Sequence, residues 1–250
     1  MRDFISPAHA RSLRSAGLDS FDALWRLELN AVDAPNAVEG GWSSVYRLDI
    51  GGAGYYLKRQ SNYLSRSWRH PFGEPTFAAE FRNICRYQHK QLPTLDVAFF
   101  AQRRAQGEVS AVLLTRALDG WQDLSSLLDR WSGIGIVSRN AVLAAGGRRA
   151  RQLHGAGEVH GCFYPKHIFL REHLGAYEAC LIDLEKTRLL LGRRDRIRDL
   201  EALVRRAELW REEELRCLLA SYLDENADSR AIEDWLKSIR ARHHYKAAKA

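Results

Sequence analysis

Residues 159–170 read VHGCFYPKHIFL, and residues 181–186 read LIDLEK. The first stretch places two histidines, seven positions apart, in a short polar loop that leads into an apolar run. The second stretch ends an apolar run on Asp183, where a buried charge needs a strong reason to be present. A metal ion supplies such a reason, so the pattern predicts a polar site with Asp183 as a metal ligand.

Composition indicates a folded globular protein. The chain has 250 residues, of which 46% are hydrophobic and 28% are charged, and this length allows one large domain or two lobes. The N-terminal residues contain no apolar run long enough for a signal peptide. Nowhere do about 18 consecutive apolar residues occur, so no membrane-spanning helix is expected. We therefore expect a cytoplasmic location.

The charge favours anionic partners, and the cysteines indicate no structural metal or disulfide. The formal net charge is +7, which suits nucleic acid, anionic lipid head groups or phosphorylated sugars. Basic residues are spread along the chain among acidic ones, so ordinary solvated surfaces explain them equally well. No nucleic-acid-binding module is recognisable, and no nucleic-acid partner is expected. The four cysteines show no CxxC spacing, and free thiols are expected.

The first half of the chain has the character of a small sheet with one helix. Two β-rich runs flank the glycine turn at 51–54 and predict a hairpin, and apolar spacing predicts one helix. A polar, proline-containing loop is expected between hairpin and helix. The expected elements are strands at 44–50, 55–59, 96–102 and 109–115, a loop at 60–76, and a helix at 77–90.

The second half is predicted to be mostly helical, with the loop of residues 159–170 between helices. Apolar stripes mark the later helices as core elements. The expected helices lie at 121–131, at 138–154, near 195–224 and at 228–242, and residues 240–250 are expected to form a frayed basic tail. The fold class is therefore α+β, with a β-sheet lobe at 1–116 and a helical lobe at 117–250.

This order of parts is typical of protein-kinase-like two-lobed folds. The chain resembles the lipopolysaccharide kinase family, the bacterial Kdo and heptose kinases, and most of all its InaA-type branch, over about residues 36–190. The resemblance rests on four strings, YYLKR at 55–59, AAEFRN at 78–83, LHGAGEVHGCFYPKHIFL at 153–170 and LIDLEKTR at 181–188. It implies an ATP-dependent kinase with ATP and Mg²⁺ as cofactors, in which the first lobe covers the nucleotide.

The resemblance assigns Lys58 and Glu80 to nucleotide binding. In such a kinase the strand lysine holds the α- and β-phosphates, and a carboxylate on the facing helix keeps the lysine in place. Glu80 lies beside the apolar stripe of the predicted helix, where an acid without a partner is costly. The alternative for Lys58 is a solvated charge at a strand edge.

Two further segments are expected to contact the nucleotide. The turn before the first strand carries Gly40, Gly41, Ser43 and Ser44, which could cover phosphates through backbone N–H groups and two hydroxyls. This turn lacks the third glycine of the protein-kinase pattern, so an ordinary turn is the alternative. The hinge at 115–118, with Arg116 and Leu118, is expected to offer backbone groups to adenine.

The metal ligands predicted from the resemblance are Asp183 and His167. His160 matches the histidine that opens the kinase catalytic loop, and His167 falls where protein kinases place their second metal ligand, an asparagine. The family uses a histidine there. The alternatives are that Asp183 only begins a turn, and that His160, His167 and Cys162 bind zinc, although their spacing fits no familiar zinc motif.

Cys162 departs from the kinase pattern. Gly161 and Cys162 occupy the Arg-Asp positions of the catalytic loop, so the aspartate that accepts the proton of the acceptor hydroxyl is missing. Loss of a general base costs about 10²–10⁴-fold in rate but does not prevent nucleotide binding. Lys166 could activate the thiol or contact the γ-phosphate, and Glu158 is a further candidate base.

Two functions remain open at this point. The first is a kinase that phosphorylates a sugar hydroxyl of the lipopolysaccharide core, with His160, Cys162 and Lys166 as catalytic residues. Its partners would be a nucleotide and an anionic glycolipid or core precursor, with peripheral contact at the inner membrane. The second is a pseudokinase, a nucleotide-binding stress-response or adaptor protein with little turnover because of Cys162.

Overall fold

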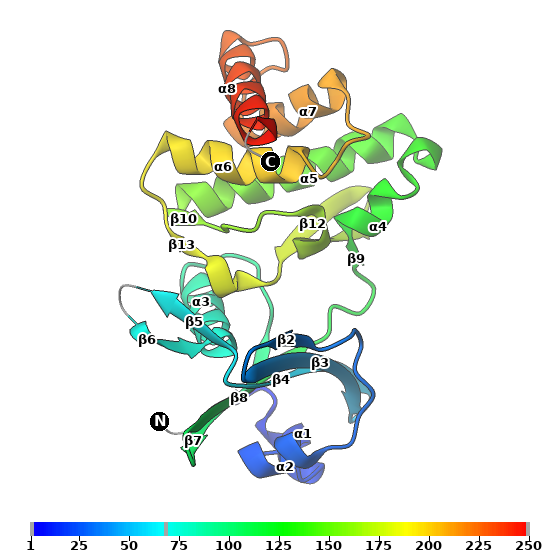
Figure 1. The fold of residues 1–250 in the computed structure, drawn as a ribbon. Coiled ribbons are helices and arrows are strands. Elements are labelled where there is room, and N and C mark those ends of the chain that lie inside the picture. Colours follow the sequence, from blue (N-terminus) through cyan, green and yellow to red (C-terminus); the bar gives the residue numbers. More distant parts are fainter. Residues whose placement is uncertain (1–2, 68–69, 249–250) are drawn as a thin grey trace. The chain divides into compact units, whose positions relative to one another are not determined.

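The computed structural model describes residues 3–67 and 70–248, which form two compact units. The first unit contains the described residues up to His89 together with Leu95–Asp119, and the second contains Lys90–Thr94 and the described residues from Gly120 onward. Figure 1 shows a sheet with few helices in the first unit and mainly helices in the second. The predicted α+β class with a β-rich lobe and a helical lobe is confirmed.

The first unit is built on a six-stranded antiparallel sheet in the order β1-β7-β8-β4-β3-β2. The predicted hairpin is β3–β4, and the two later predicted strands are β7 and β8. The turn at 106–107 joins β7 to β8, and both of its residues have positive φ. The strands are β1 (Phe4–Ile5), β2 (Asn36–Val38), β3 (Gly41–Ile50), β4 (Ala53–Ser61), β7 (Val97–Ala105) and β8 (Glu108–Arg116).

Side chains of this sheet alternate between two covered faces, as successive strand residues must. On one face, Leu57 packs in a core with Leu13 and Phe21 from the helices α1 (Ala10–Ser15) and α2 (Phe21–Arg26). On the other face lies α3 (Thr76–His89), whose Phe81 stacks on Phe100 of β7 with ring centroids 4.3 Å apart. Figure 1 shows α1 and α2 on one side of the sheet and α3 on the other.

Two predictions for the first unit need correction. The sheet carries α1 and α2 in addition to the one predicted helix, which matches α3. Residues 60–76 are not simply a loop, because β5 (Leu64–Ser67) and β6 (His70–Pro75) pair as a second small hairpin. Pro75 and Gly73 obscured this pattern, since both residues are disfavoured in regular strands.

The second unit places helices around short strands. In Figure 1, α5 lies between the strands on one side and α7 and α8 on the other. The helices are α4 (Leu124–Leu128), α5 (Ile136–Gly155), α6 (Arg193–Val204), α7 (Glu212–Leu223) and α8 (Arg230–Ala247). The strands are β9 (Gln122–Asp123), β10 (Glu158–Val159), β11 (Ile168–His173), β12 (Ala176–Leu181) and β13 (Arg188–Leu189), and single 3₁₀ turns occupy Trp131–Gly133, Pro165–His167 and Leu184–Lys186.

Close packing of α5 against α7 requires a glycine. A Cβ atom on Gly147 would lie 2.3 Å from the carbonyl oxygen of Leu218 on α7, a distance that no side chain tolerates. The two helices therefore approach each other at the backbone level, which gives α5 a fixed place in the core of this unit.

Three helix predictions for this unit need revision. Residues 121–131 form β9 and the short helix α4 instead of one helix, because Asp123 caps α4 by accepting a hydrogen bond from Ser126 N. The segment near 195–224 is two helices, α6 and α7. The residues that join them include Trp210, whose side chain is buried. The expected frayed tail is helical as far as Ala247, so the basic residues of its first part belong to α8.

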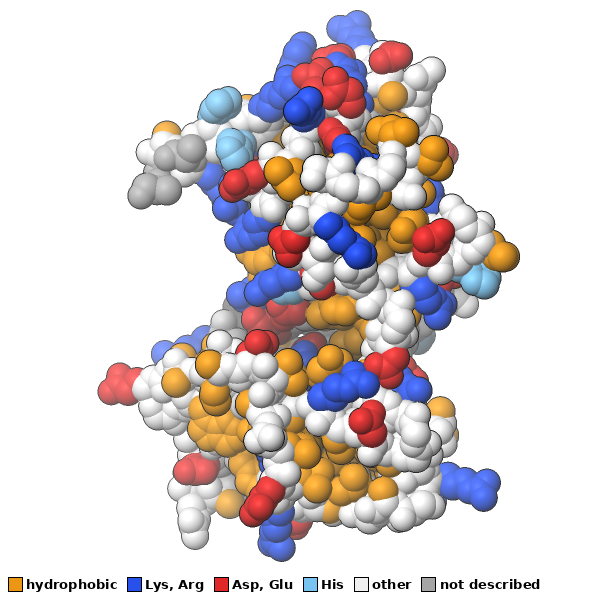
Figure 2. Space-filling model, turned by 90° about the vertical axis from the view of Figure 1, so that its right-hand side faces the viewer, with side chains coloured by type: hydrophobic (Ala, Val, Ile, Leu, Met, Phe, Trp, Pro, Cys, Tyr) orange, Lys and Arg blue, Asp and Glu red, His pale blue; other side chains and the backbone are white. Residues whose placement is uncertain are grey.

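Charged side chains are distributed as the sequence suggested. On the face in Figure 2, Lys and Arg side chains are scattered with Asp and Glu side chains among them. Among the described residues, no helix has both the length and the apolar character needed to cross a bilayer.

Candidate active site

The catalytic-loop candidate of the second unit runs from β10 to β11, and His160 lies at its buried centre. The ring nitrogen Nε2 lies 3.0 Å from the carbonyl oxygen of Ile182, and Nδ1 accepts a hydrogen bond from Cys162 N at 3.3 Å. A carbonyl only accepts, so Nε2 carries the hydrogen and the imidazole is neutral. Burial lowers the pKa of His160 to about 4. His160 thus joins the loop to the residue before Asp183.

Asp199 on α6 binds the backbone of the same loop and was not identified from the sequence. Its carboxylate accepts hydrogen bonds from the backbone N–H groups of His160, at 2.7 Å, and Gly161, at 3.0 Å. The side chain is buried, and His154 lies 3.3 Å away through Nε2. A usable signal existed in the sequence, because Asp199 sits four residues before Leu203 on the apolar side of a helix.

Gly161 allows the loop to pass close to the segment after Asp183. Its φ is +78°, a conformation that L side chains rarely adopt, and an added Cβ would lie 2.6 Å from the carbonyl oxygen of Lys186. An arginine at this position, as in protein kinases, is therefore incompatible with this backbone path.

His167 and Asp183, the predicted metal ligands, face each other. His167 Nε2 lies 2.9 Å from Asp183 Oδ2, while His167 Nδ1 donates to the carbonyl oxygen of Cys162 at 2.9 Å. With the hydrogen of a neutral imidazole on Nδ1, Nε2 presents a lone pair to a carboxylate oxygen. Two acceptors at this distance are stable only with a second ring proton or with a cation that both atoms bind.

Backbone geometry also sets Asp183 apart. The residue has φ 60° and ψ 58°, in the left-handed region, which costs free energy for a non-glycine residue and is concentrated at functional sites. A carboxylate oxygen suits Mg²⁺, and one imidazole nitrogen is a softer but usable ligand. The donor set therefore fits a divalent cation that would take its remaining ligands from groups outside this pair.

A zinc site on the loop has no support. Both ring nitrogens of His160 are engaged within the unit, and His167 Nδ1 is bonded to a backbone carbonyl. In the part of the chain that the structure describes, no group of three or more His, Cys, Asp or Glu side chains could hold a metal ion.

Cys162 lies between an ammonium group and a phenol. Its side chain is only 5% exposed. The sulfur raises the pKa of the Lys186 ammonium by its charge, while burial and then a hydrogen bond to Cys162 raise the pKa of Tyr164. The sequence pointed to Lys166 as the cation beside the thiol, but Lys166 is exposed, and Lys186 is the lysine whose pKa the Cys162 sulfur raises.

Glu158, considered as a substitute base, is committed elsewhere. Its side chain is fully buried, and its Oε1 accepts from Lys90 Nζ at 2.5 Å. Lys90 also donates to the carbonyl oxygen of Ala156 at 2.9 Å. Glu158 therefore anchors Lys90 to the start of the loop, and a carboxylate in this position is poorly placed to accept a proton from a substrate.

In the first unit, Lys58 and Glu80 come together as expected for a nucleotide-binding pair. Lys58 Nζ donates to both carboxylate oxygens of Glu80, at 2.7 and 2.8 Å, and Glu80 is 1% exposed. The alternation along β4 turns Lys58 toward α3, while Leu57 enters the opposite core. Lys58 is thus a half-buried strand lysine held by a buried helix carboxylate, and not a solvated edge charge.

Gln60, two residues along the same face of β4, fixes α3 and was missed in the sequence. Its Oε1 accepts hydrogen bonds from Phe77 N and from Thr76 Oγ1, both at 2.9 Å. These bonds tie the first turn of α3 to the strand that carries Lys58. Glu80 follows one turn later on this helix, so Gln60 sets the position of the Lys58–Glu80 pair.

The turn residues expected over the phosphates are only partly brought together. Gly41 approaches Asn62 so closely that a Cβ would lie 2.4 Å from its carbonyl oxygen, and Gly40 has φ +71°. Ser43 pairs across the sheet with Gln60 and shares the face of Lys58. Ser44 pairs with Arg59 and points to the opposite face, so the structure separates its hydroxyl from Lys58.

The hinge residues differ in what their backbone can offer. Arg116 N donates to the carbonyl oxygen of Asp96 at 2.8 Å, and Ala117 N donates to that of Gly54 at 2.9 Å. Among the described residues, the N–H of Leu118 has no backbone acceptor. Of the two predicted hinge residues, Leu118 is therefore the one whose N–H is not taken up by a described backbone carbonyl.

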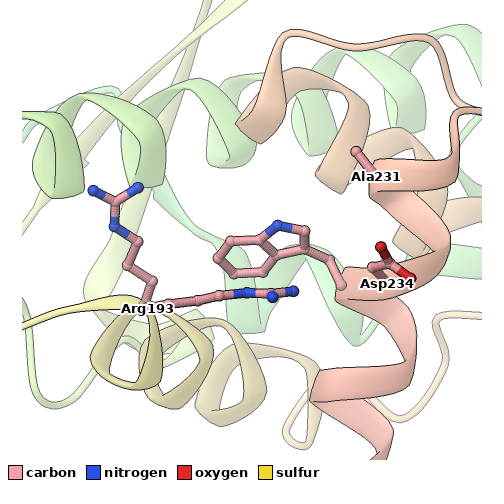
Figure 3. A pocket seen from close by; sticks show the side chains of 5 residues that line it. Arg193, Ala231 and Asp234 are labelled. Atoms are coloured by element: carbon pink, nitrogen blue, oxygen red, sulfur yellow. The ribbon is translucent and has the colours of Figure 1, made fainter.

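A separate pocket of about 510 Å³ lies between α6 and α8 of the second unit. Figure 3 shows Arg193 entering it from α6 and Ala231 and Asp234 from α8. Trp235 also lines it, with the Arg193 guanidinium 5.1 Å from the ring centroid. None of the predicted site residues lines this pocket.

Comparison with known proteins agrees with these features. Residues 22–222 match the model of the lipopolysaccharide kinase (Kdo/WaaP) family. The protein InaA of Escherichia coli (strain K12) is 31% identical over 185 residues, which cover 72% of this chain and 83% of InaA. A solved structure of WaaP in complex with acyl carrier protein superposes with a TM-score of 0.72 at 22% identity, covering 100% of this chain and 99% of that one, and so shares the fold. The chain belongs to the lipopolysaccharide kinase (Kdo/WaaP) family.

Proposed function

We propose that the protein is an ATP-dependent kinase that phosphorylates a sugar hydroxyl of the lipopolysaccharide core. The observation that carries the proposal is the His167–Asp183 pair, because an imidazole nitrogen and a carboxylate oxygen 2.9 Å apart, on a strained backbone, suit a shared cation. Family membership supports the reaction class.

In this proposal each unit has a separate task. In the first unit, Lys58 binds the α- and β-phosphates while Glu80 keeps the ammonium in position. Gly40, Gly41 and Ser43 cover the phosphates through the β2–β3 turn. The N–H of Leu118 donates a hydrogen bond to adenine. Arg116 takes part in nucleotide binding through its side chain, which packs over the Tyr55 ring.

In the second unit, Asp183 and His167 hold the divalent cation. When bound, Mg²⁺ neutralises negative charge on the β- and γ-phosphates. His160 does not exchange protons near neutral pH, since burial keeps its pKa at about 4. It positions the loop by joining the backbone at Cys162 to the carbonyl before Asp183.

The absent aspartate does not exclude turnover. Phosphoryl transfer passes through a loose transition state, so positioning and charge neutralisation supply most of the catalysis. Lys186 places an ammonium next to Cys162, where it can offset charge on the transferred group. The acceptor proton can leave to solvent late in the reaction, at a cost of about 10²–10⁴-fold in rate relative to an enzyme with a base.

The second candidate function is a pseudokinase that binds nucleotide with little turnover. The observation that favours it is the burial of Cys162, whose thiol occupies the position of the general base. Both candidates retain Lys58, Glu80 and Asp183, so both predict that Mg²⁺-ATP raises the melting temperature.

Label transfer distinguishes the two candidates. Purified protein is incubated with γ-labelled ATP, Mg²⁺ and dephosphorylated core oligosaccharide. Transfer of label to the oligosaccharide supports the kinase. No transfer, together with a rise in melting temperature with Mg²⁺-ATP, supports the pseudokinase, and the absence of both results contradicts the nucleotide site itself.

A cytoplasmic location, with peripheral contact at the inner membrane, completes the proposal. An anionic glycolipid acceptor presented at the membrane surface would be attracted by the net charge of +7. Flotation with vesicles containing the anionic core glycolipid tests this contact.

A further inference from the structure

A pocket of about 460 Å³ opens in the second unit beside the catalytic loop. Three parts of this unit meet there, namely α4, the loop itself, and the turn after α6. Cationic side chains outnumber acidic ones in the lining, by three to one. The lining residues are Ser125, Tyr164, Pro165, Lys166, Arg205, Arg206 and Glu208.

Arg206 is held in place on the wall of this pocket. Its guanidinium carbon lies 3.6 Å from the centroid of the Tyr164 ring, and its Nη1 donates to the carbonyl oxygen of Ala202 at 3.3 Å. Neither Arg206 nor Lys166 forms an ion pair with any residue that the structure describes. Two full positive charges therefore face the pocket, and the more rigid of them is already oriented for a ligand.

Cationic side chains outside the pocket help to keep its wall positively charged. Arg205 Nε donates to Glu201 Oε1 at 2.8 Å, and Glu201 is fully buried. Arg242 and Lys246 of α8 also lie 3.6 Å from the other oxygen of this carboxylate. One carboxylate thus faces three cations, so Arg205 is not neutralised and the wall remains positive.

Tyr164 connects the pocket to the site of phosphoryl transfer. Its backbone N donates to the carbonyl oxygen of Cys162 at 2.8 Å, and, after burial, the Cys162 side chain is the next cause that raises the pKa of its phenol. The same ring carries Arg206 on its face. A ligand group bound at Arg206 is therefore separated from the position of the general base by one aromatic side chain.

We infer that this pocket binds a phosphate monoester carried by the acceptor, on a sugar next to the one that is phosphorylated. The inference rests on the proposed function and names the substrate class as a glycan that is already phosphorylated. A phosphate monoester carries about −1.5 to −2 charges at neutral pH, which matches an excess of two cations over one acid better than a carboxylate does. The volume exceeds that of one phosphate group and leaves room for its sugar.

Binding of mannose 6-phosphate to the full-length protein, measured by titration calorimetry without nucleotide, tests the inference. Mannose and glucuronate serve as neutral and carboxylate probes. We expect mannose 6-phosphate to bind more tightly than either, with an affinity that falls as salt concentration rises. Arg206→Gln should weaken it by about 10- to 100-fold, the effect of losing a charge-assisted hydrogen bond.

Arg193→Gln is the matched control. Arg193 also lies on α6 and over an aromatic ring, that of Trp235, but it belongs to the other pocket, shown in Figure 3. Its loss should leave the affinity unchanged. Equal affinities of the wild type and Arg206→Gln, or equal losses in both variants, would overturn the inference. Equal binding of mannose and mannose 6-phosphate would also overturn it.

Kinetics separates this inference from the proposed function. For an acceptor with a phosphate on the neighbouring sugar, Arg206→Gln should raise KM about tenfold or more with kcat nearly unchanged, whereas the melting-temperature shift with Mg²⁺-ATP should persist. An absence of label transfer to every acceptor contradicts the proposed function alone, provided that the phosphate-specific binding remains. Label transfer with an unchanged KM contradicts the pocket assignment alone.

Discussion

Asp199 and His160 are joined by a hydrogen bond of 2.7 Å from the backbone N of His160 to Asp199 Oδ2. The same carboxylate accepts from Gly161 N at 3.0 Å. One buried side chain on α6 thus anchors the two residues that precede Cys162. The helix thereby fixes the position of this part of the loop. The geometry of the loop therefore depends on a residue 38 and 39 positions further along the chain than the two residues that it anchors.

Asp199→Ala should lower the free energy of unfolding by about 2–4 kcal/mol, because it leaves backbone donors without their acceptor. Chemical denaturation at neutral pH measures the change. Asp234→Ala, which removes an exposed carboxylate on α8, should stay within about 0.5 kcal/mol of the wild type. Similar losses in both variants would show that Asp199 has no special anchoring role.

Lys58→Met should abolish the rise in melting temperature with Mg²⁺-ATP and also reduce stability, by about 3 kcal/mol. The stability loss follows because Glu80, 1% exposed, stays buried without the ammonium group of Lys58. Adding Glu80→Gln to this variant should restore part of the stability but none of the nucleotide effect. Restoration of both would mean that Lys58 acts only as a structural partner of Glu80.

His160 should make stability fall as the pH decreases from about 6.5 to about 4. Burial lowers its pKa from 6.5 to about 4, so in this range the unfolded chain binds a proton that the folded protein does not. The contribution is complete above pH 6.5 and amounts to about 3 kcal/mol. Denaturation of His160→Asn at several pH values should show a shallower slope between pH 6.5 and 4.

Asp195 titrates in a different window and so does not confuse that measurement. Its hydrogen bonds to Arg188 lower its pKa from 3.8 to about 2. A carboxylate with a lowered pKa contributes stability above pH 3.8 and loses it as the pH falls toward 2.

An equal slope for wild type and His160→Asn above pH 4 would contradict the assignment of the neutral imidazole.

Cys162→Asp should increase label transfer, by about 10²-fold or more, if the missing base limits the rate. Lys186 beside this position would stabilise the new carboxylate in its ionised form. Cys180→Ser is the control, because that thiol is buried at the end of β12 and burial raises its pKa to about 11. No gain in the aspartate variant, with Mg²⁺-ATP binding intact, would show that another group already fills the role.

Much of this architecture could be predicted from local pattern. The β3–β4 hairpin has alternating side chains and a glycine turn, and α3 and α5 have clear helical spacing. The short helices α1 and α2 could not be predicted, since six residues form a helix only when tertiary packing supports it. Leu13 and Phe21 provide that packing under the sheet.

The candidate site likewise has residues that local sequence could predict and residues that only the folded structure brings together. Lys58, Glu80, His167 and Asp183 were predicted because they occur in a recognisable order along the chain. Lys186 was missed because only the positive φ of Gly161 brings its segment against the loop. Ser44 was assigned to the phosphates, but which face of β3 it occupies follows from the register with β4, and neighbouring sequence does not determine that register.

The central claim is that His167 and Asp183 hold the cation for phosphoryl transfer from ATP. Its most direct test compares wild type with Asp183→Asn in transfer of γ-label from ATP to core oligosaccharide that lacks phosphate on the accepting sugar, with Mg²⁺ present. We predict transfer by the wild type and a loss of at least about 10³-fold in the variant, whose melting temperature without nucleotide should be close to that of the wild type. Equal transfer by the two proteins would contradict the account.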